Sequence, residues 1–345
     1  MESDSSPADR IAPERLAALY RTMLRIRAFE NAAEVASRGG VAAFGAAAAA
    51  GALVRGPLHL STGQEAVPAG VCANLARSDY LTSTHRGHGH AIAKGAEPRA
   101  MMCELFGKSG GTNGGKGGSM HIADFSAGML GANGVVAAGI PIAAGAAHAI
   151  RIRGGDAVVA CFFGDGAVNR GPFLEGLNWA RVFDLPVLFV CEDNRYSATT
   201  ATESMTGGEG AAARARAIGV PAQQVDGNDV AAVDAAAARL LALVREGGGP
   251  QFLHALTYRF KGHVSVDPAT YRDAAEVERA LAQDPIERAG QRLAALGVDA
   301  DRLRALREEA EAEIARALAA AAASPAPPAH AAYRDVQDCG AGQWR

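Results

Sequence analysis

The sequence lacks a surplus of charge of either sign. Its 345 residues include 34 Lys and Arg against 37 Asp and Glu, which gives a formal net charge of −3 at pH 7. Nucleic-acid-binding proteins usually carry a clear basic surplus, so we predict no nucleic-acid partner. Apolar residues, by contrast, make up 49% of the chain. That content is enough for a substantial core and argues against a disordered chain.

Paired cysteines are also lacking. No two of the five cysteines form a CxxC pair, which disfavours a zinc ribbon or a thioredoxin-like site. Scattered cysteines suit a reducing compartment, and residues 1–10 lack the apolar run of a secretory signal and the arginines of a transit peptide. We therefore predict a cytoplasmic protein. The five cysteines are Cys72, Cys103, Cys161, Cys191 and Cys339.

One segment resembles a membrane span only in its length. Residues 129–150 contain no Lys, Arg, Asp or Glu and reach the roughly 20 residues that a bilayer requires. The segment consists mostly of Gly and Ala, and Asn133, Pro141 and His148 interrupt it. We predict a buried loop followed by a helix, and no membrane partner.

Two short apolar runs give the clearest prediction of regular structure. Residues 156–163 and 186–191 flank a helical pattern at 173–183. This order predicts a strand–helix–strand unit with a buried parallel pair of strands. Further strands are predicted at 80–83, 222–225 and 252–258, and further helices at 13–38, 64–75, 211–218, 230–245 and 274–323, the last with breaks at Asp284-Pro285 and at Gly297.

The remaining segments have little periodicity. Residues 39–56 are rich in Ala and Gly, and the glycines at 108–119 predict a mobile or tightly turning loop. We expect a disordered lead-in at 1–12, a single α/β domain at 13–323 with a helical C-terminal part, and a linker-like tail at 324–345.

Two familiar glycine motifs are incomplete. Gly164-x-Gly166-x-x-Asn169 follows a predicted strand but lacks the third glycine of a dinucleotide site, which disfavours a nicotinamide cofactor. Gly107-Lys108-Ser109 resembles the end of a P-loop, but Met102 stands where that loop needs a glycine, and no strand precedes it. We reject both interpretations.

Polar residues follow both runs of the strand–helix–strand unit. Asp165 comes after the first strand, and Asn194 comes after the second. Ligands of open α/β sheets bind at the carboxyl ends of the strands, where a helix N-terminus also suits a phosphate. Carboxylate and amide oxygens, together with the nearby carbonyl of Tyr196, are ligands that Mg²⁺ prefers. The sequence therefore predicts a magnesium–diphosphate site.

These residues carry a resemblance to a known family. Gly164-Asp165-Gly166, followed by Glu192-Asp193-Asn194-Arg195-Tyr196, resembles the thiamine diphosphate motif of the E1 α subunits of 2-oxo acid and acetoin dehydrogenases. The resemblance implies a three-layer αβα fold with a mainly parallel sheet and a helical C-terminal extension. It also implies thiamine diphosphate and Mg²⁺ as cofactors, with Asp165, Asn194 and the Tyr196 carbonyl as metal ligands.

Other motifs follow in the family's order and imply further contacts. Arg86 matches the arginine that grips the diphosphate, while His85 replaces the tyrosine that usually precedes it. The resemblance further implies cofactor-binding roles for His85, Gly134, Val136, Gly166, Ala167 and His263. Histidine exchanges protons near neutral pH. We therefore expect catalytic roles for His263, which the family uses in transfer to the lipoyl acceptor, and for His88 and His59.

The resemblance also implies a reaction and partners. The motifs at 84–90 and 120–134 look more like those of acetoin dehydrogenase α subunits than of pyruvate ones, so acetoin is the expected substrate, with pyruvate or another 2-oxo acid as the alternative. The family's catalytic glutamate comes from a β subunit. We therefore expect half a site that works as an α2β2 heterotetramer with a lipoyl acyltransferase, E2.

Two other interpretations stay open. The first is half of a split transketolase, which the segment Gly63-Gln64-Glu65 and the loop from His263 to Pro268 disfavour. The second is a non-catalytic module that binds a phosphate or a nucleotide on the same strand–helix–strand unit, since a fold alone never establishes function.

Overall fold

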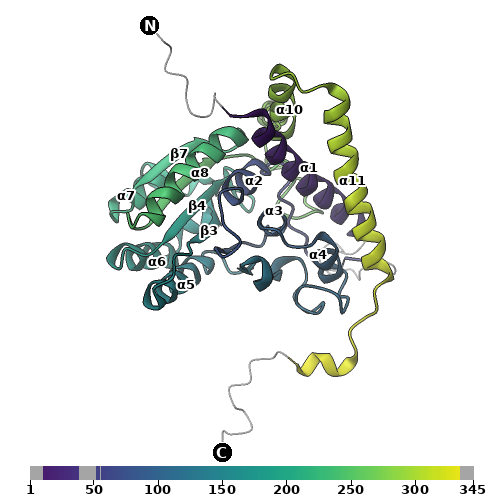
Figure 1. Ribbon diagram of the computed structural model, residues 1–345, viewed down its shortest axis with the longest axis horizontal. Helices are drawn as coiled ribbons and strands as arrows, with labels where there is room; N and C mark the ends of the chain where they lie inside the picture. The colour runs from purple at the N-terminus through teal and green to yellow at the C-terminus, as the bar shows by residue number, and fades with distance from the viewer. Residues whose placement is uncertain (1–10, 39–51, 55, 335–345) are drawn as a thin grey trace, which may run out of the picture.

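A six-stranded parallel sheet forms the centre of the computed structural model, which describes residues 11–38, 52–54 and 56–334 (Figure 1). The strand order is β2-β1-β3-β4-β8-β7, and every neighbouring pair is parallel. The strands are β1 (Tyr80–Thr82), β2 (Met129–Gly131), β3 (Val159–Gly164), β4 (Val187–Asp193), β7 (Ala222–Asp226) and β8 (Gln251–Leu256). A separate antiparallel pair joins β5 (Tyr196–Ser197) to β6 (Thr200–Ala201).

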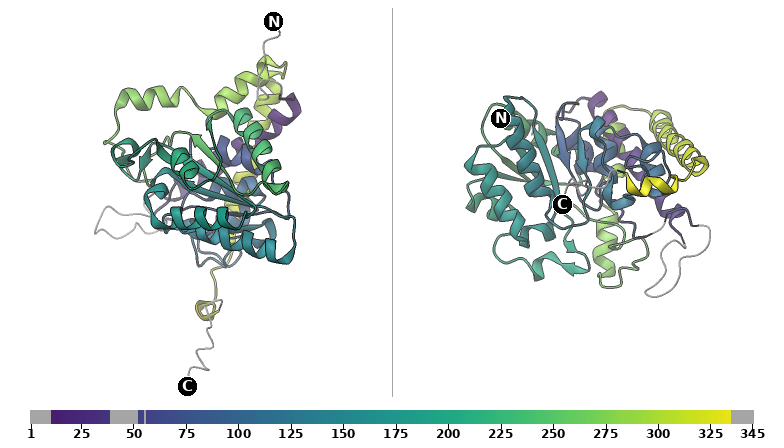
Figure 2. Two further views of the ribbon diagram at one scale, coloured as in Figure 1. Left: turned by 90° about the vertical axis from the view of Figure 1, so that its left-hand side faces the viewer. Right: turned by 90° about the horizontal axis from the view of Figure 1, so that it is seen from below.

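Helices cover both faces of the sheet because its central strands are apolar on both sides. In β3, Ala160 and Phe162 join one core cluster, whereas Cys161 and Phe163 join the other. This alternation follows from the two-residue period of a strand. The first face packs against α1 (Pro13–Ala36), α2 (Ala66–Cys72), α3 (His88–Lys94), α4 (Pro98–Leu105) and α8 (Val230–Arg245); the second packs against α5 (Gly139–Arg153), α6 (Gly171–Val182) and α7 (Gly210–Ala217) (Figure 2). The predicted three-layer α/β fold is confirmed.

The C-terminal part consists of three helices with polar caps. They are α9 (Ala274–Leu281), α10 (Pro285–Ala295) and α11 (Ala300–Ala323), and α11 runs along α1 and α4 (Figure 1). The side chain of Asp284 caps α10 by accepting from Ile286 N at 2.8 Å, and Gly297 follows α10 with φ of +88°. The two predicted breaks are therefore real, because proline begins a helix well and glycine tolerates the left-handed conformation that ends one.

Most predicted elements are present with shifted ends. The helix predicted at 64–75 is shorter, Ala66–Cys72, and the strand predicted at 156–163 begins later, at Val159. Segment 129–150 contains the predicted helix as most of α5, but it begins with the unpredicted strand β2, and its loop is exposed at residues 134–136 instead of buried. Helices α3 and α4 were not predicted, because they have only seven and eight residues, too few to show a clear helical period.

Several sequence predictions concern residues outside the described part. These residues include the lead-in up to residue 10, most of the Ala/Gly-rich segment, residues 335–345 and Cys339. The four described cysteines are buried and free of disulfides. Within the described residues, no helix combines the length and the apolar character needed to cross a bilayer.

The strand order places a switch point between β1 and β3. From β1 the chain moves outward to β2 on one side, whereas β3, β4 and β8 follow one another on the other side. Loops that leave β1 and β3 therefore diverge and leave a crevice at the carboxyl edge of the sheet. Open α/β sheets bind their ligands in this place.

Candidate cofactor-binding site

A cavity of about 230 Å³ lies at this carboxyl edge. Its walls come from the loops that follow β1, β2, β3, β4 and β8. The lining includes His59, His85, Arg86, Gly134, Val136, Asp165, Gly166, Ala167, Asn194, Tyr196 and His263. Every residue expected to bind the cofactor or the metal therefore faces one space. A wider hollow of about 600 Å³ lies at the ends of β7 and β8, and none of these residues lines it.

Asp165 provides the strongest chemical feature of the cavity. The register Gly164↔Glu192 places it beside the end of β4, and only 2% of its surface is exposed. Burial, and next the charge of Asp193, raise the pKa of Asp165 to about 7. The hydroxyl of Thr202 donates to its Oδ2 atom. A buried carboxylate whose pKa is raised by desolvation is suited to bind a divalent cation, because the cation offsets the cost of burying the negative charge.

Asn194 is oriented for the same position by neighbours that the sequence did not indicate. Its amide Nδ2 donates to Gln64 Oε1 at 3.0 Å, and its Oδ1 accepts from Tyr196 N at 3.2 Å. Gln64 lies far away in sequence, just before α2, so no local signal could have linked the two residues. The Asn194 side-chain oxygen retains a second lone pair, which the donor set of a magnesium site can use.

Two buried arginines add positive charge to the cavity. Arg86 donates to the carbonyls of Leu60 at 3.0 Å and His263 at 2.9 Å, and burial lowers its pKa to about 9, so it is still cationic at neutral pH. Arg259, which follows β8, is only 1% exposed, and sequence reasoning missed it because a lone arginine outside any motif gives no signal. Together they suit an anionic, diphosphate-type ligand.

Gly166 also fits a ligand that approaches the backbone closely. A Cβ atom placed there would lie 3.0 Å from Cβ of Ser197, so a larger residue would disturb the turn after β3. The segment Asp165–Asn169 is a short 3₁₀ helix, and α6 begins directly after it at Gly171. The free N–H groups of such a turn are suited to phosphate oxygens.

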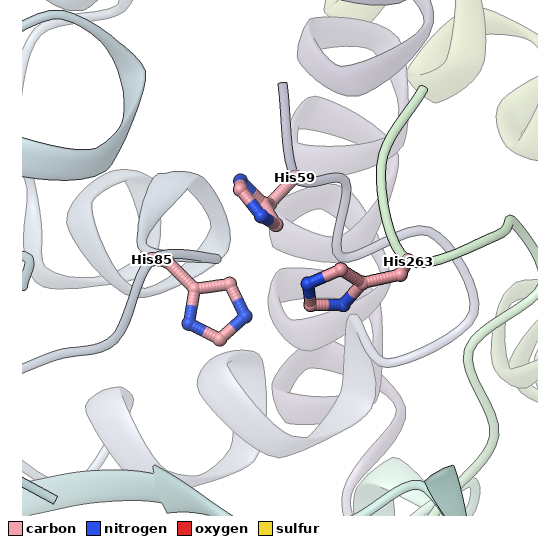
Figure 3. A group of neighbouring side chains, drawn as sticks. All are labelled: His59, His85 and His263. Atoms are coloured by element: carbon pink, nitrogen blue, oxygen red, sulfur yellow. The ribbon is translucent and has the colours of Figure 1, made fainter. Parts of the chain in front are cut away.

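Three histidines from separate loops meet in the cavity (Figure 3). The ring centroids of His59 and His85 are 4.6 Å apart, and those of His59 and His263 are 4.9 Å apart. Burial, followed by the charge of Arg86, lowers the pKa of His59 to about 3, of His85 to about 2 and of His263 to about 4. All three rings are therefore neutral at physiological pH.

The hydrogen bond of His263 defines what its ring can offer. Arg86 Nη2 lies 3.0 Å from His263 Nδ1. A guanidinium can only donate, so Nδ1 accepts and the ring proton resides on Nε2. One ring nitrogen from each of the three histidines lies within 4.8 Å of the others, a spacing that could hold a metal ion. The protonated Nε2 and the nearby arginine favour hydrogen-bond donation to a ligand instead.

His88 lies behind the cavity and does not line it. It is fully buried, with Nδ1 2.8 Å from Glu30 Oε2 and Nε2 3.0 Å from the Ser119 hydroxyl. Glu30 also accepts from Ser61 N at 2.9 Å. Both ring nitrogens are thus engaged within the protein, and a catalytic role for His88 stays a prediction.

The neutral histidines predict an acid-dependent loss of stability. The unfolded chain protonates His59 below about pH 6.5, whereas the folded chain does so only near pH 3, so acid favours unfolding in between. His59→Gln should remove this contribution. We expect the wild type to lose about 1.4 kcal/mol more than this variant per pH unit between pH 6 and 4. Urea unfolding of the cofactor-free chain measures the difference, with the exposed His330→Gln as control. Parallel pH curves for wild type and His59→Gln would contradict the assignment.

The fold and the cavity define an α/β protein with a polar cavity, lined by buried arginine and carboxylate side chains, at the switch point of a parallel sheet. The model of the dehydrogenase E1 component family matches residues 47–330, and the chain belongs to this family. It is therefore a thiamine diphosphate-dependent oxidoreductase.

Individual relatives are similar over most of their length. The chain is 45% identical over 277 residues to the α subunit of acetoin:2,6-dichlorophenolindophenol oxidoreductase of Cupriavidus necator. The matched stretch covers 80% of this chain and 79% of the relative. The Bacillus subtilis protein of the same name is 44% identical over 278 residues, with 80% of each chain covered. Pyruvate dehydrogenase E1 component subunit alpha of Rhizobium meliloti is 40% identical over 276 residues, covering 79% of this chain and 76% of the relative. The family resemblance seen in the motifs is confirmed.

Proposed function

We propose that this chain is the α subunit of an E1 enzyme that cleaves acetoin and passes the acetyl unit to the lipoyl group of an E2 acyltransferase. One observation carries the proposal. The carboxylate, the amide, the arginine and three of the four histidines expected from the motifs, all but His88, line a single cavity at the switch point of the sheet. Similarity to the two acetoin enzymes supports acetoin as the substrate, and similarity to the pyruvate enzymes supports pyruvate as the second candidate.

The residues of this chain have distinct proposed roles. Asp165, Asn194 and the Tyr196 carbonyl hold Mg²⁺, and Arg86, Gly166 and Ala167 hold the diphosphate. The backbone at Gly134 and Val136 contacts the aminopyrimidine. When bound, thiamine diphosphate would supply a nucleophilic carbon and an electron sink for cleavage of a substrate C–C bond. The Nε2–H group of His263 would donate a hydrogen bond to an oxygen near the reacting carbon, and His59 and His85 would exclude water beside it.

We further propose that residues 13–323 form one cofactor-binding domain and that a β subunit completes its site in an α2β2 assembly. Phe125, at 73% exposed, and Val135, at 68%, are apolar side chains left in contact with solvent, and Val135 lies at the cavity wall. Exposed apolar side chains beside the cavity, such as Val135 and the neighbouring Val136, are suited to contact with a partner surface. The β subunit would supply the carboxylate that activates the cofactor.

One carboxylate of this chain competes with that assignment. Glu192 lines the cavity, and its Oε2 lies 3.1 Å from His90 Nε2, off the line needed for a hydrogen bond. Glu65, by contrast, is bound to Arg27, and Glu175 does not line the cavity. An enzyme that is active without a β subunit would therefore point to Glu192.

Reconstitution tests the proposal directly. The chain would be purified alone and together with the E1 β subunit encoded by the same organism. Thiamine diphosphate would be titrated into each by calorimetry with and without Mg²⁺, and turnover of acetoin and pyruvate would be followed with dichlorophenolindophenol. We expect tight, Mg²⁺-dependent binding and acetoin turnover only in the co-complex. Full activity of the chain without the β subunit would refute the half-site assignment. If the co-complex turned over pyruvate but not acetoin, pyruvate would be assigned as the substrate.

A further inference from the structure

The glycine-rich loop that leads into the cavity is folded around one buried carboxylate. Glu104, in the last turn of α4, has no exposed surface. Its Oε2 accepts from Asn113 N at 2.7 Å and Gly115 N at 2.9 Å, and its Oε1 accepts from Gly117 N at 2.6 Å and Gly118 N at 3.1 Å. Four backbone amides from a six-residue segment thus converge on one side chain, and hydrogen bonds to a charged acceptor are stronger than neutral ones.

The glycines of this loop are required by the same arrangement. A Cβ atom at Gly111 would lie 2.8 Å from Glu104 Cα, and one at Gly115 would lie 2.7 Å from Lys108 N. Gly115 also has φ of +77°. The glycines that predicted a loop here therefore allow the main chain to pack closely around the Glu104 carboxylate, where larger residues would not fit.

Other contacts attach this loop to the protein on two sides. At its end, the Ser119 hydroxyl lies 3.0 Å from His88 Nε2. On the outside, Ser109 N donates to the Pro325 carbonyl at 3.0 Å, and Lys116 Nζ donates to the Arg334 carbonyl. The segment after α11 therefore lies against the outer side of the loop.

The loop continues directly into the cavity wall. Met120 lines the cavity, and its sulfur lies 3.9 Å from a Cβ atom placed at Gly134, where the aminopyrimidine is proposed to bind. The Asn113 side chain reinforces this exit, because its Nδ2 donates to the His121 carbonyl and its Oδ1 accepts from Ala123 N at 3.2 Å. The position of Met120 thus depends on how residues 113–118 are folded.

We propose that Glu104 is a positioning residue of the cofactor site: its carboxylate folds the loop at 113–118 and thereby holds Met120 against the proposed aminopyrimidine position. The expected effect on cofactor binding rests on the proposed function, whereas the role of Glu104 in folding the loop does not. Glu104→Gln keeps the side-chain shape, but its amide would present hydrogens to two backbone N–H donors and leave them without an acceptor. We expect the loop to open while the rest of the fold stays intact.

Limited proteolysis tests the loop independently of activity. Trypsin can cut after Lys108 and Lys116, and both bonds should be protected while the loop is folded around Glu104. In Glu104→Gln we expect cleavage at these two bonds, mapped by mass spectrometry on the full chain, to be at least about tenfold faster than in the wild type. Glu97→Gln, an exposed glutamate at the other end of α4, is the matched control and should be cut at the wild-type rate.

Kinetics of the complex with the β subunit separate positioning from a loss of folded protein. For Glu104→Gln we expect the KM for thiamine diphosphate to rise about tenfold while kcat falls less than about threefold, with partial rescue in Glu104→Asp. A general loss of folded enzyme would lower kcat at unchanged KM and would overturn the proposal, as would wild-type proteolysis of Glu104→Gln. If that variant does not fold, Asn113→Ala, which leaves the Glu104 contacts in place, should show the same changes more weakly. Failure of the wild type to bind thiamine diphosphate would refute the proposed function, while proteolysis would still decide the role of Glu104 in the loop.

Discussion

Asp165→Asn is expected to abolish Mg²⁺-dependent binding of thiamine diphosphate and to lower acetoin turnover at least about a thousandfold. The asparagine keeps the shape of the side chain but removes the charge that a divalent cation needs. Asp165 is buried directly after β3, so the isosteric amide would occupy the same position. Calorimetry of the co-complex and the dichlorophenolindophenol assay would measure the two losses.

The same substitution should stabilise the cofactor-free chain. The unfolded carboxyl ionises near 3.8, whereas the folded pKa is about 7, so between these values the folded state holds a proton that the unfolded state has lost. Rising pH therefore favours unfolding across this window, by up to about 4 kcal/mol at pH 7. Asp165→Asn carries no such penalty, and its advantage over the wild type should grow from pH 4 to pH 7 and then level off.

Asp156→Asn provides the matched control for this prediction. Asp156 is exposed and lies just before the opposite end of the same strand. It should leave cofactor binding unchanged and shift the unfolding free energy by less than about 0.5 kcal/mol. If Asp165→Asn instead kept Mg²⁺-dependent binding, or destabilised the cofactor-free chain at pH 7, Asp165 would not be the metal ligand that its burial indicates.

Arg27→Met is expected to cost about 3–5 kcal/mol of stability. Arg27 in α1 pairs with Glu65, which is completely buried, and with Asp284 at 2.9 Å. Burial raises the pKa of Glu65 even with the arginine present, so without it the carboxylate would be a buried charge with no cation beside it. Chemical unfolding at pH 7 measures the loss, which should shrink at acid pH as Glu65 takes up a proton.

The Arg27→Met substitution should also disturb the position of Gln64 in the cofactor site. Glu65 Oε2 accepts from Gly63 N at 3.0 Å, and this turn carries Gln64, which orients Asn194. The double variant Arg27→Met/Glu65→Gln, which keeps an acceptor for Gly63, should recover more than half of the lost stability. Arg21→Met is the control on the same helix, because its pair with Glu309 is 3.8 Å long and exposed, and it should cost less than about 1 kcal/mol. Equal losses for Arg21 and Arg27 would show that the buried pair has no special role.

The placement of Asp165 and Asn194 at one edge of the sheet could be predicted because it depends on local features. The apolar runs that became β3 and β4 were recognisable in the sequence, and the two strands pair in register, so Asp165 and Asn194 had to emerge at the same edge. The histidines were less certain. His59 and His263 do face the cavity, but His88, from an equally well matched motif, points to Glu30 inside the core. Motif membership does not say which way a side chain turns.

Sequence features alone were enough to predict the strand–helix–strand unit, the polar residues at its strand ends, the helix breaks at Pro285 and Gly297 and the membership of a family. These follow from local periodicity, from backbone preferences and from motifs with a known spacing. The packing of the folded chain was needed to show that Gln64 orients Asn194, that Arg259 enters the cavity, and that Glu104 contacts the glycine-rich loop. Each of these contacts joins a side chain to a partner from another loop or strand. Such contacts depend on how the chain packs, so local spacing in the sequence does not predict them.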